Sequence, residues 1–235
     1  MKVTIHQPQY FPYPGFFHKL SISDVFIIMD DAQYDKRFTN RNKIMATNGW
    51  IWLTVPINKD HKFLPNSRVE INNDISWRDE HWKKIYHSYA NTRYFKKYDV
   101  FFKSIYERKW QSLFELNLET LQKVIDILGI KVKIIKSSEL NVTGTSTEKL
   151  VNLCKAVGAD TYVSGIGGRN YMDENLFGKN KIKLEFQNYV AKQYLQRLSD
   201  SFIPDLSIID MLVNVGPGCM QVISESDVSL APIIH

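Results

Sequence analysis

The chain has 235 residues, of which 44% are hydrophobic and 23% are charged, and this is the composition of a folded globular protein rather than a disordered one. Its net charge of +5 comes from 30 basic and 25 acidic residues, a smaller excess than a dedicated binder of duplex nucleic acid usually carries. We therefore expect no nucleic acid partner and a small anionic molecule as the substrate.

A chain of this length can bury a sizeable core, and we predict a single α/β domain over residues 1–235. No apolar run approaches the roughly twenty residues that cross a bilayer, and polar residues and prolines interrupt the N-terminal segment. We therefore expect no signal peptide, no membrane insertion and a cytoplasmic location. Cys154 and Cys219 lie in apolar contexts that indicate buried reduced thiols. Without a CxxC, HExxH or EF-hand pattern, we predict no metal site.

The first predicted strand is residues 2–7, KVTIHQ, which ends in polar side chains. The three prolines and the glycine in residues 8–15 predict an irregular loop, because proline fixes φ and lacks a donor N–H. Residues 16–23, FFHKLSIS, are expected to form one or two helical turns. The apolar run DVFIIMD at residues 24–30 predicts a second strand that is covered on both faces.

A third strand is predicted at residues 50–57, WIWLTVPI, where Pro56 halts it. Residues 77–110 contain 11 aromatic residues, and nine basic residues against four acidic ones. The helical spacing of the aromatic residues favours an amphipathic helical pair over a nucleic-acid surface. A further helix is predicted at residues 114–128, because its apolar residues step by +4 and +3 and Gly129 follows as a C-cap. We predict that residues 77–128 form an aromatic-rich helical insertion or cap.

Strands and helices alternate over the rest of the chain. We predict strands at residues 130–135, 161–165 and 182–189, and helices within residues 144–160 and 207–216. Short apolar strands that alternate with helices indicate a parallel sheet with helices on both faces. The predicted fold class is therefore α/β, three-layer, with a mainly parallel sheet flanked by helices.

Three polar stretches follow predicted strands. They are HQPQYFPYPG at residues 6–15, DDAQYDKRFTNRNK at residues 30–43 and SGIGGRNY at residues 164–171. In open α/β sheets, ligands bind outside the carboxyl ends of the strands. We therefore expect the three stretches to meet at one edge of the sheet and to form a site.

A proton-transfer role is predicted for the first stretch. His6 ends the first strand, and a histidine there can act as a general base because its pKa lies near neutrality. A purely structural histidine is the alternative. The residues that we predict to take part in catalysis are His6, Gln7, Gln9 and Tyr10.

A substrate-binding role is predicted for the other stretches. Guanidinium and ammonium groups bind phosphate or carboxylate, and amides bind hydroxyls or a base edge. A glycine-rich loop lets backbone N–H groups approach an anion. The alternatives are a solvated basic loop and a plain tight turn, and the two adjacent carboxylates Asp30 and Asp31 are too few to predict a magnesium site. The predicted substrate-binding residues are Lys19, Asp30, Gln33, Lys36, Arg37, Asn40, Arg41, Asn42, Ser164, Gly165, Gly167, Gly168, Arg169 and Tyr171.

Taken together, these stretches resemble the WbqC-like family of bacterial proteins. The matching pieces are IHQPQYFPYPGFFHKL, DDAQYDKRFTNRNKI, WLTVPI, YVSGIGGRNYMDE and LSIIDMLVNVG, spread from residue 5 to residue 216. Family members are associated with gene clusters for surface polysaccharide, or O-antigen. The resemblance implies a role in making or modifying an activated sugar.

The opening of the chain is also similar to nucleotidyltransferases and pantothenate-synthetase-like ligases, which carry an HxGH signature after their first strand. In this sequence Tyr13 and Phe16 occupy the positions of the two histidines, and only Gly15 is retained. This departure argues against ATP-dependent adenylyl transfer, although the likeness in fold stands.

We expect first a transferase that modifies a nucleotide-linked amino sugar, by N-acyl or aminoacyl transfer from an acyl donor such as CoA or a carrier-protein thioester. The second hypothesis is an ATP-dependent nucleotidyltransferase or adenylate-forming ligase, which would use ATP with Mg²⁺. The third is a non-catalytic protein that binds a sugar nucleotide or assists assembly. The sequence leaves the sugar, the donor and the oligomeric state open.

Overall fold

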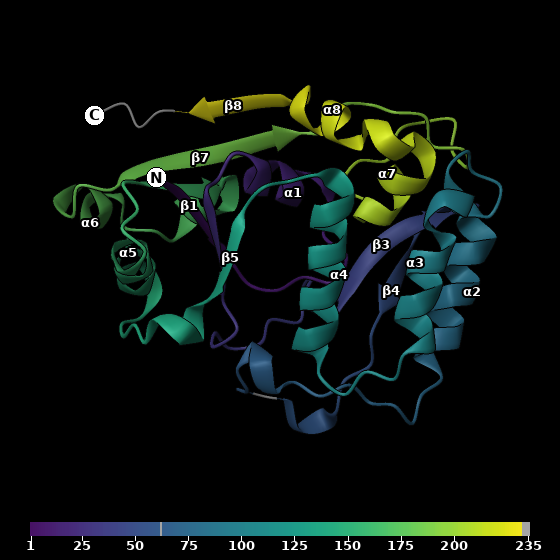
Figure 1. The fold of residues 1–235 in the computed structure, drawn as a ribbon, viewed down its shortest axis with the longest axis horizontal. Helices are drawn as coiled ribbons and strands as arrows, with labels where there is room; N and C mark the ends of the chain where they lie inside the picture. Colours follow the sequence, from purple (N-terminus) through teal and green to yellow (C-terminus); the bar gives the residue numbers. More distant parts are fainter. Residues whose placement is uncertain (62, 232–235) are drawn as a thin grey trace.

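A computed structural model describes residues 1–61 and 63–231 of the chain. Its centre is a six-stranded sheet with the strand order β5-β2-β1-β6-β7-β8 (Figure 1). The first five of these strands run parallel to one another, and β8 pairs antiparallel with β7 at one edge. The strands are β1 (Lys2–His6), β2 (Val25–Ile28), β5 (Lys133–Lys136), β6 (Thr161–Gly165), β7 (Lys183–Val190) and β8 (Asp227–Ala231).

Helices cover both faces of this sheet. On one face, α5 and α6 pack on alternate residues of the strands, among them Val3 and Ile5 of β1. On the other face, α1, α4, α7 and α8 share a larger core with Phe26 and Ile28 of β2. The helices are α1 (Pro14–Ser21), α4 (Leu113–Leu128), α5 (Ser146–Ala156), α6 (Glu174–Lys179), α7 (Ile208–Val215) and α8 (Cys219–Ser224). The predicted three-layer α/β fold is confirmed.

A two-stranded antiparallel hairpin, β3 (Arg41–Ala46) and β4 (Gly49–Thr54), stands apart from the main sheet. It lies between α4 and the pair α2 (Trp77–Tyr89) and α3 (Phe95–Glu107), as Figure 1 shows. The sequence predicts a polar stretch and no strand at residues 41–43, but these residues begin β3. Asn42 and Ile44 are buried, while Arg41 and Lys43 are only partly buried, which is the alternation of a half-buried strand.

Helix α4 begins and ends as its sequence predicts. The Ser112 side chain accepts a hydrogen bond from the Glu115 N–H, and Gly129 follows the helix at a φ of 68°. Single turns of 3-10 helix complete the described structure: Lys59–His61, Asn66–Arg68, Ser137–Leu140, Ile166–Asn170 and Gly216–Gly218. None of the helices within the described ranges is long and apolar enough to cross a membrane.

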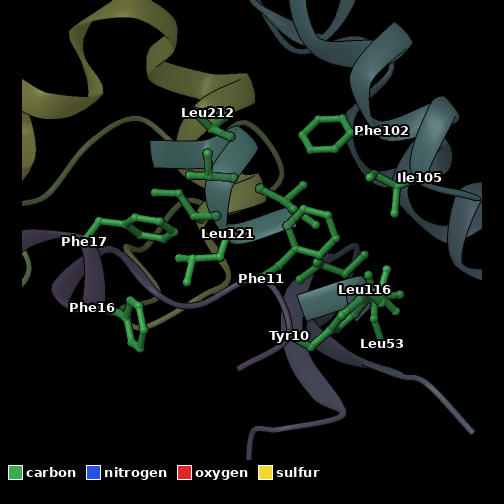
Figure 2. Packing of buried hydrophobic residues seen from close by; sticks show 14 of the residues in the cluster. Tyr10, Phe11, Phe16, Phe17, Leu53, Phe102, Ile105, Leu116, Leu121 and Leu212 are labelled. Atoms are coloured by element: carbon green, nitrogen blue, oxygen red, sulfur yellow. The ribbon is translucent and has the colours of Figure 1, made fainter. Parts of the chain in front are cut away.

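The loop between β1 and α1 crosses the core. Tyr10 and Phe11 are fully buried, and Figure 2 shows them among side chains that α3, α4, α7 and β4 contribute. Phe11 has a φ of 41°, a strained value for an L-residue. Its carbonyl oxygen accepts hydrogen bonds from Asn42 Nδ2 at 2.7 Å and from Ser207 Oγ at 2.9 Å. These two bonds hold the strained loop in place.

Asp210 of α7 is a second buried polar anchor. Its Oδ2 accepts hydrogen bonds from the Tyr194 hydroxyl at 2.8 Å and Gln196 Nε2 at 3.1 Å, while Oδ1 has no partner among the described groups. Burial raises the pKa of this carboxyl above its ordinary value. Asp210 therefore ties the segment before α7 to the helix, which is a structural role.

Replacing Asn42 with Ala should destabilise the fold by about 1–3 kcal/mol, because the Phe11 carbonyl and the Lys43 N–H would each lose a partner inside the core. Denaturant unfolding of both proteins measures this change. Asn175→Ala is the matched control, since Asn175 is exposed on α6. An Asn42→Ala protein as stable as the control would contradict the anchoring role.

The pH dependence of Asp210→Asn tests the buried carboxyl. Because its pKa is raised in the folded state, the folded chain binds this proton more tightly than the unfolded chain does. The ionised group therefore costs stability at neutral pH, and the native chain should gain stability relative to Asp210→Asn as the pH falls. Thermal unfolding over a pH series measures the difference, with the exposed Asp200→Asn as a control. A pH-independent difference would mean that Asp210 does not titrate as its burial requires.

Candidate functional site

The strand order reverses direction at β1, which lies between β2 and β6. In open parallel sheets, such a switch point opens a crevice at the carboxyl ends of the strands. A cavity of about 370 Å³ lies there, and we call it the first cavity. Its lining residues are Ile5, His6, Gln7, Pro8, Gln9, Met29, Asp35, Arg37, Phe38, Thr39, Leu150, Tyr162 and Tyr171.

His6 ends β1 with its ring at the first cavity, half-buried and 5.2 Å from the Phe16 ring in an edge-on contact. Nδ1 lies 2.9 Å from the Gln7 carbonyl oxygen. A carbonyl oxygen only accepts, so Nδ1 carries the proton and Nε2 keeps its lone pair. Loss of hydration, together with the positive charge of Lys19, lowers the pKa of His6 to about 3. The ring is therefore neutral over the physiological range, and it is a weaker base than the histidine of near-neutral pKa that the sequence predicts.

Lys19 of α1 supplies that positive charge. Its side chain is only 4% exposed, and its ammonium lies 5.9 Å from the centre of the Phe16 ring. Among the side chains that the structure describes, no carboxylate lies within ion-pair distance of it. Burial lowers the pKa of Lys19 to about 8. The protein thus keeps an uncompensated cation beside His6.

Asp35 and Arg37 form an ion pair at the first cavity. Arg37 donates through Nε at 2.8 Å and through Nη2 at 2.5 Å to Asp35 Oδ2. The guanidinium holds the pKa of Asp35 below its ordinary value. The pair fixes the direction of an otherwise exposed arginine and leaves its Nη1 without a described partner. Arg37 can therefore present one further charged donor to a ligand.

A second cavity, of about 360 Å³, shares Gln9 and Phe38 with the first. Its other lining residues are Tyr13, Asn42, Lys43, Tyr189 and Asp205. The rings of Tyr13 and Tyr189 pack directly against Gly15. A Cβ on this residue would lie 2.5 Å from Tyr13 Cε2 and 2.6 Å from Tyr189 Cδ1. The glycine is required for space, since any side chain would push the two rings away from the first turn of α1.

The structure brings together only part of the predicted site. His6, Gln7, Gln9, Arg37 and Tyr171 line the first cavity. Gln33 and Lys36 are exposed on the preceding loop and line neither cavity.

The Tyr10 hydroxyl is buried against His81 and Tyr106, at 3.1 and 2.6 Å. Asn40 donates to the Val55 carbonyl oxygen at 2.8 Å. Their polar groups are thus directed to other parts of the protein and not to the first cavity.

Asp30 and Asp31 are also engaged inside the protein. Asp30 accepts hydrogen bonds from Ser137 and Ser138, which join the ends of β2 and β5. Asp31 pairs with Lys149 of α5 at 2.6 Å. Within the described residues, no group of three or more metal-ligating side chains is present. These carboxylates therefore stabilise the carboxyl edge of the sheet.

The glycine-rich stretch forms the 3-10 turn Ile166–Asn170 after β6. A Cβ on Gly168 would lie 2.3 Å from Met172 Cε and 2.4 Å from Ser164 Oγ, so close packing requires that glycine. Gly165 and Gly167 face open space. Arg169 packs 4.8 Å from the Phe186 ring centre, and Tyr171 reaches the first cavity. Anion binding by this turn stays a prediction.

The predicted site residues do not include Phe38 or the tryptophans near the cavities. Phe38 lines both cavities, and its ring contacts Trp52 at 6.2 Å. The signal was present in the WIW of residues 50–52, since alternate residues of a strand share a face. Tryptophan is enriched at interaction surfaces, so this pattern could have marked the surface.

Two of the comparisons with known proteins give matches. A family model described as WbqC-like protein family matches residues 7–222, which include every lining residue of the two cavities except Ile5 and His6. The chain is also similar to Uncharacterized protein Rv1507c of Mycobacterium tuberculosis (strain ATCC 25618 / H37Rv). The two are 34% identical over 217 residues, 92% of this chain and 94% of the relative. No solved structure matches the chain.

His6 should stay neutral down to about pH 5, because its pKa is lowered to about 3 against an ordinary 6.5. Nitrogen NMR of the imidazole, assigned with His6→Gln, should show a protonated Nδ1 and an unprotonated Nε2. An imidazolium signal at about pH 5 would contradict the assignment. Because the pKa of His6 is lower in the folded chain, the unfolded chain binds this proton more tightly. The free energy of unfolding should therefore fall as the pH falls from 6.5 towards 3, and His6→Gln should remove this loss.

Proposed function

The chain belongs to the WbqC-like protein family, and from this premise we propose that it is a transferase of surface-polysaccharide biosynthesis. The proposed substrate is a nucleotide-linked amino sugar in the cytoplasm, and the proposed reaction is N-acyl or aminoacyl transfer. The family association with surface-polysaccharide gene clusters supports the pathway. The residues at the two cavities support the reaction class.

The observation that carries the proposal is the pair of adjoining cavities. A transferase must hold a donor and an acceptor side by side, and the two cavities share Gln9 and Phe38. The first cavity contains the neutral base His6 and the oriented cation Arg37. The second contains Lys43 and adjoins the amino end of α1, whose partial positive charge favours an anionic donor.

His6 would take the proton in this reaction. The acceptor amine attacks the acyl carbon, and Nε2 of His6 accepts the proton that the amine loses as the new C–N bond forms. The bond between the acyl carbon and its leaving group breaks, and the leaving group takes the proton from His6. Because Nδ1 is committed to the Gln7 carbonyl oxygen, only Nε2 can serve.

A second candidate, ATP-dependent nucleotidyl transfer, is favoured by the strand order. Counted within the main sheet, the parallel strands follow the order third, second, first, fourth, fifth, which is common among nucleotide-binding sheets. The residues at the HxGH positions weaken it. Tyr13 lines the second cavity, but Phe16 is buried against His6 and Phe26 and offers nothing to a phosphate.

Calorimetric titration tests the proposal against its alternatives. UDP- and dTDP-linked amino sugars should bind, and Arg37→Ala should weaken this binding roughly tenfold, the value of one charge-assisted hydrogen bond. Arg93→Ala, an exposed arginine between α2 and α3, is the matched control. Titrations with acetyl-CoA and with ATP, with and without Mg²⁺, identify the co-substrate. Mg²⁺-dependent binding of ATP without binding of a sugar nucleotide would contradict the proposal and favour nucleotidyl transfer.

His6→Gln separates a catalyst from a binding protein. Turnover of the amino-sugar nucleotide with the acyl donor that binds should fall by about 10²–10⁴-fold, with substrate affinity nearly unchanged. His87→Gln, an exposed histidine on α2, should keep full turnover. Ligand binding without turnover in the native protein, and a change in affinity alone in His6→Gln, would point to a non-catalytic partner.

A further inference from the structure

An exposed surface of rings and cations extends from the two cavities along the β3–β4 hairpin. We call it the platform, and it consists of Phe38, Arg41, Lys43, Trp50 and Trp52. The rings contact one another, with Phe38 at 6.2 Å from Trp52 and Trp50 at 5.5 Å from Trp52. Trp50 is 42% exposed and Phe38 is 41% exposed.

The hairpin register places these side chains on one face. Trp50 and Trp52 are alternate residues of β4, and Lys43 of β3 lies directly opposite Trp52. The other face carries Ile44 and Leu53, which are buried in the core. The core therefore fixes the platform in place, and the Trp50 and Phe38 side chains stay 42% and 41% exposed.

Cations lie over the tryptophans. The Arg41 guanidinium carbon is 4.4 Å from the centre of the Trp52 ring, and its Nε donates to the Arg37 carbonyl oxygen at 3.1 Å. The Lys43 ammonium is 4.7 Å from the Trp50 ring centre. A guanidinium close to an aromatic ring adds a planar, positively charged group on which a base can stack.

We propose that the platform binds the base of the nucleotide-linked substrate. Phe38 belongs to both the first cavity and the platform, so a ligand that extends out of the cavity reaches Trp52 across it. The sugar then lies at His6, the diphosphate at Arg37, and the base on the surface of Phe38, Arg41 and Trp52. The inference rests on the proposed function, and it assigns a place to the base of the proposed substrate.

Charge complementarity favours this ligand over an apolar partner. An apolar protein surface would have to strip water from Arg41 and Lys43 without offering them a counter-charge. A nucleotide brings a planar base to the Arg41 guanidinium and the aromatic faces, and its diphosphate at Arg37 keeps negative charge close to the platform cations. Since every base has such a face, the platform should accept nucleotides of different bases with similar affinity.

Calorimetry with three probes tests the assignment: UMP, UDP-N-acetylglucosamine and N-acetylglucosamine 1-phosphate. Trp52→Ala should weaken the two ligands that carry a base roughly tenfold and leave the sugar phosphate unchanged. Trp52→Phe should keep most of the affinity because it keeps a ring. Tyr86→Ala, an exposed aromatic residue on α2, is the control and should bind all three probes like the native chain.

Arg41→Lys provides a variant that disturbs the fold less. It keeps the charge but loses the planar guanidinium, so affinity for UMP should fall while the sugar phosphate binds as before. The platform is overturned if UMP does not bind the native protein, or if Trp52→Ala weakens all three probes equally. If UMP binds through Trp52 but the sugar phosphate does not bind at all, the proposed function fails and the platform stands.

Discussion

The carbonyl oxygen of Phe11 receives two hydrogen bonds inside the core, one from a strand of the hairpin and one from the residue before α7. These bonds join three segments that are far apart in the sequence, and they hold Phe11 at a positive φ. Gln9, which lines both cavities, lies two residues before Phe11, and Tyr13, which lines the second cavity, lies two residues after it. The hydrogen bonds to Phe11 therefore hold residues of both cavities in place. A strained residue persists only where its surroundings determine it fully, and here the surroundings are the core itself.

Local sequence signals predicted the elements that depend on local physics. The apolar run before Asp30 became a strand buried on both faces, and the stepped apolar residues before Gly129 became α4. The hairpin was missed because its β3 strand is dense with polar residues, and its inward Asn42 serves a carbonyl that is distant in sequence. Only the assembled fold shows that partner. The extent of the domain and the role of residues 77–128 as an insertion stay predictions.

The same distinction separates the site residues. The position of His6 at the end of β1 followed from the sequence, because the carboxyl ends of parallel strands form an edge. The neutral state of His6 did not, since it depends on burial and on Lys19 from another element. Tyr10 and Asp30 looked equally polar in the sequence, but the fold gives them internal partners. Residue type therefore predicted the region of the site, and the hydrogen-bond partners in the fold determine the role of each side chain.

The edge position of β5 has a consequence for the behaviour of the protein at high concentration. An edge strand offers unpaired backbone groups to any neighbouring chain, and sheets can join there into aggregates. β5 begins and ends with a lysine, Lys133 and Lys136, and Lys133 is exposed. Adding a second copy of this strand would bring like charges together across the new pair. The lysines thus protect the colloidal stability of the chain at an edge that its cavities never use.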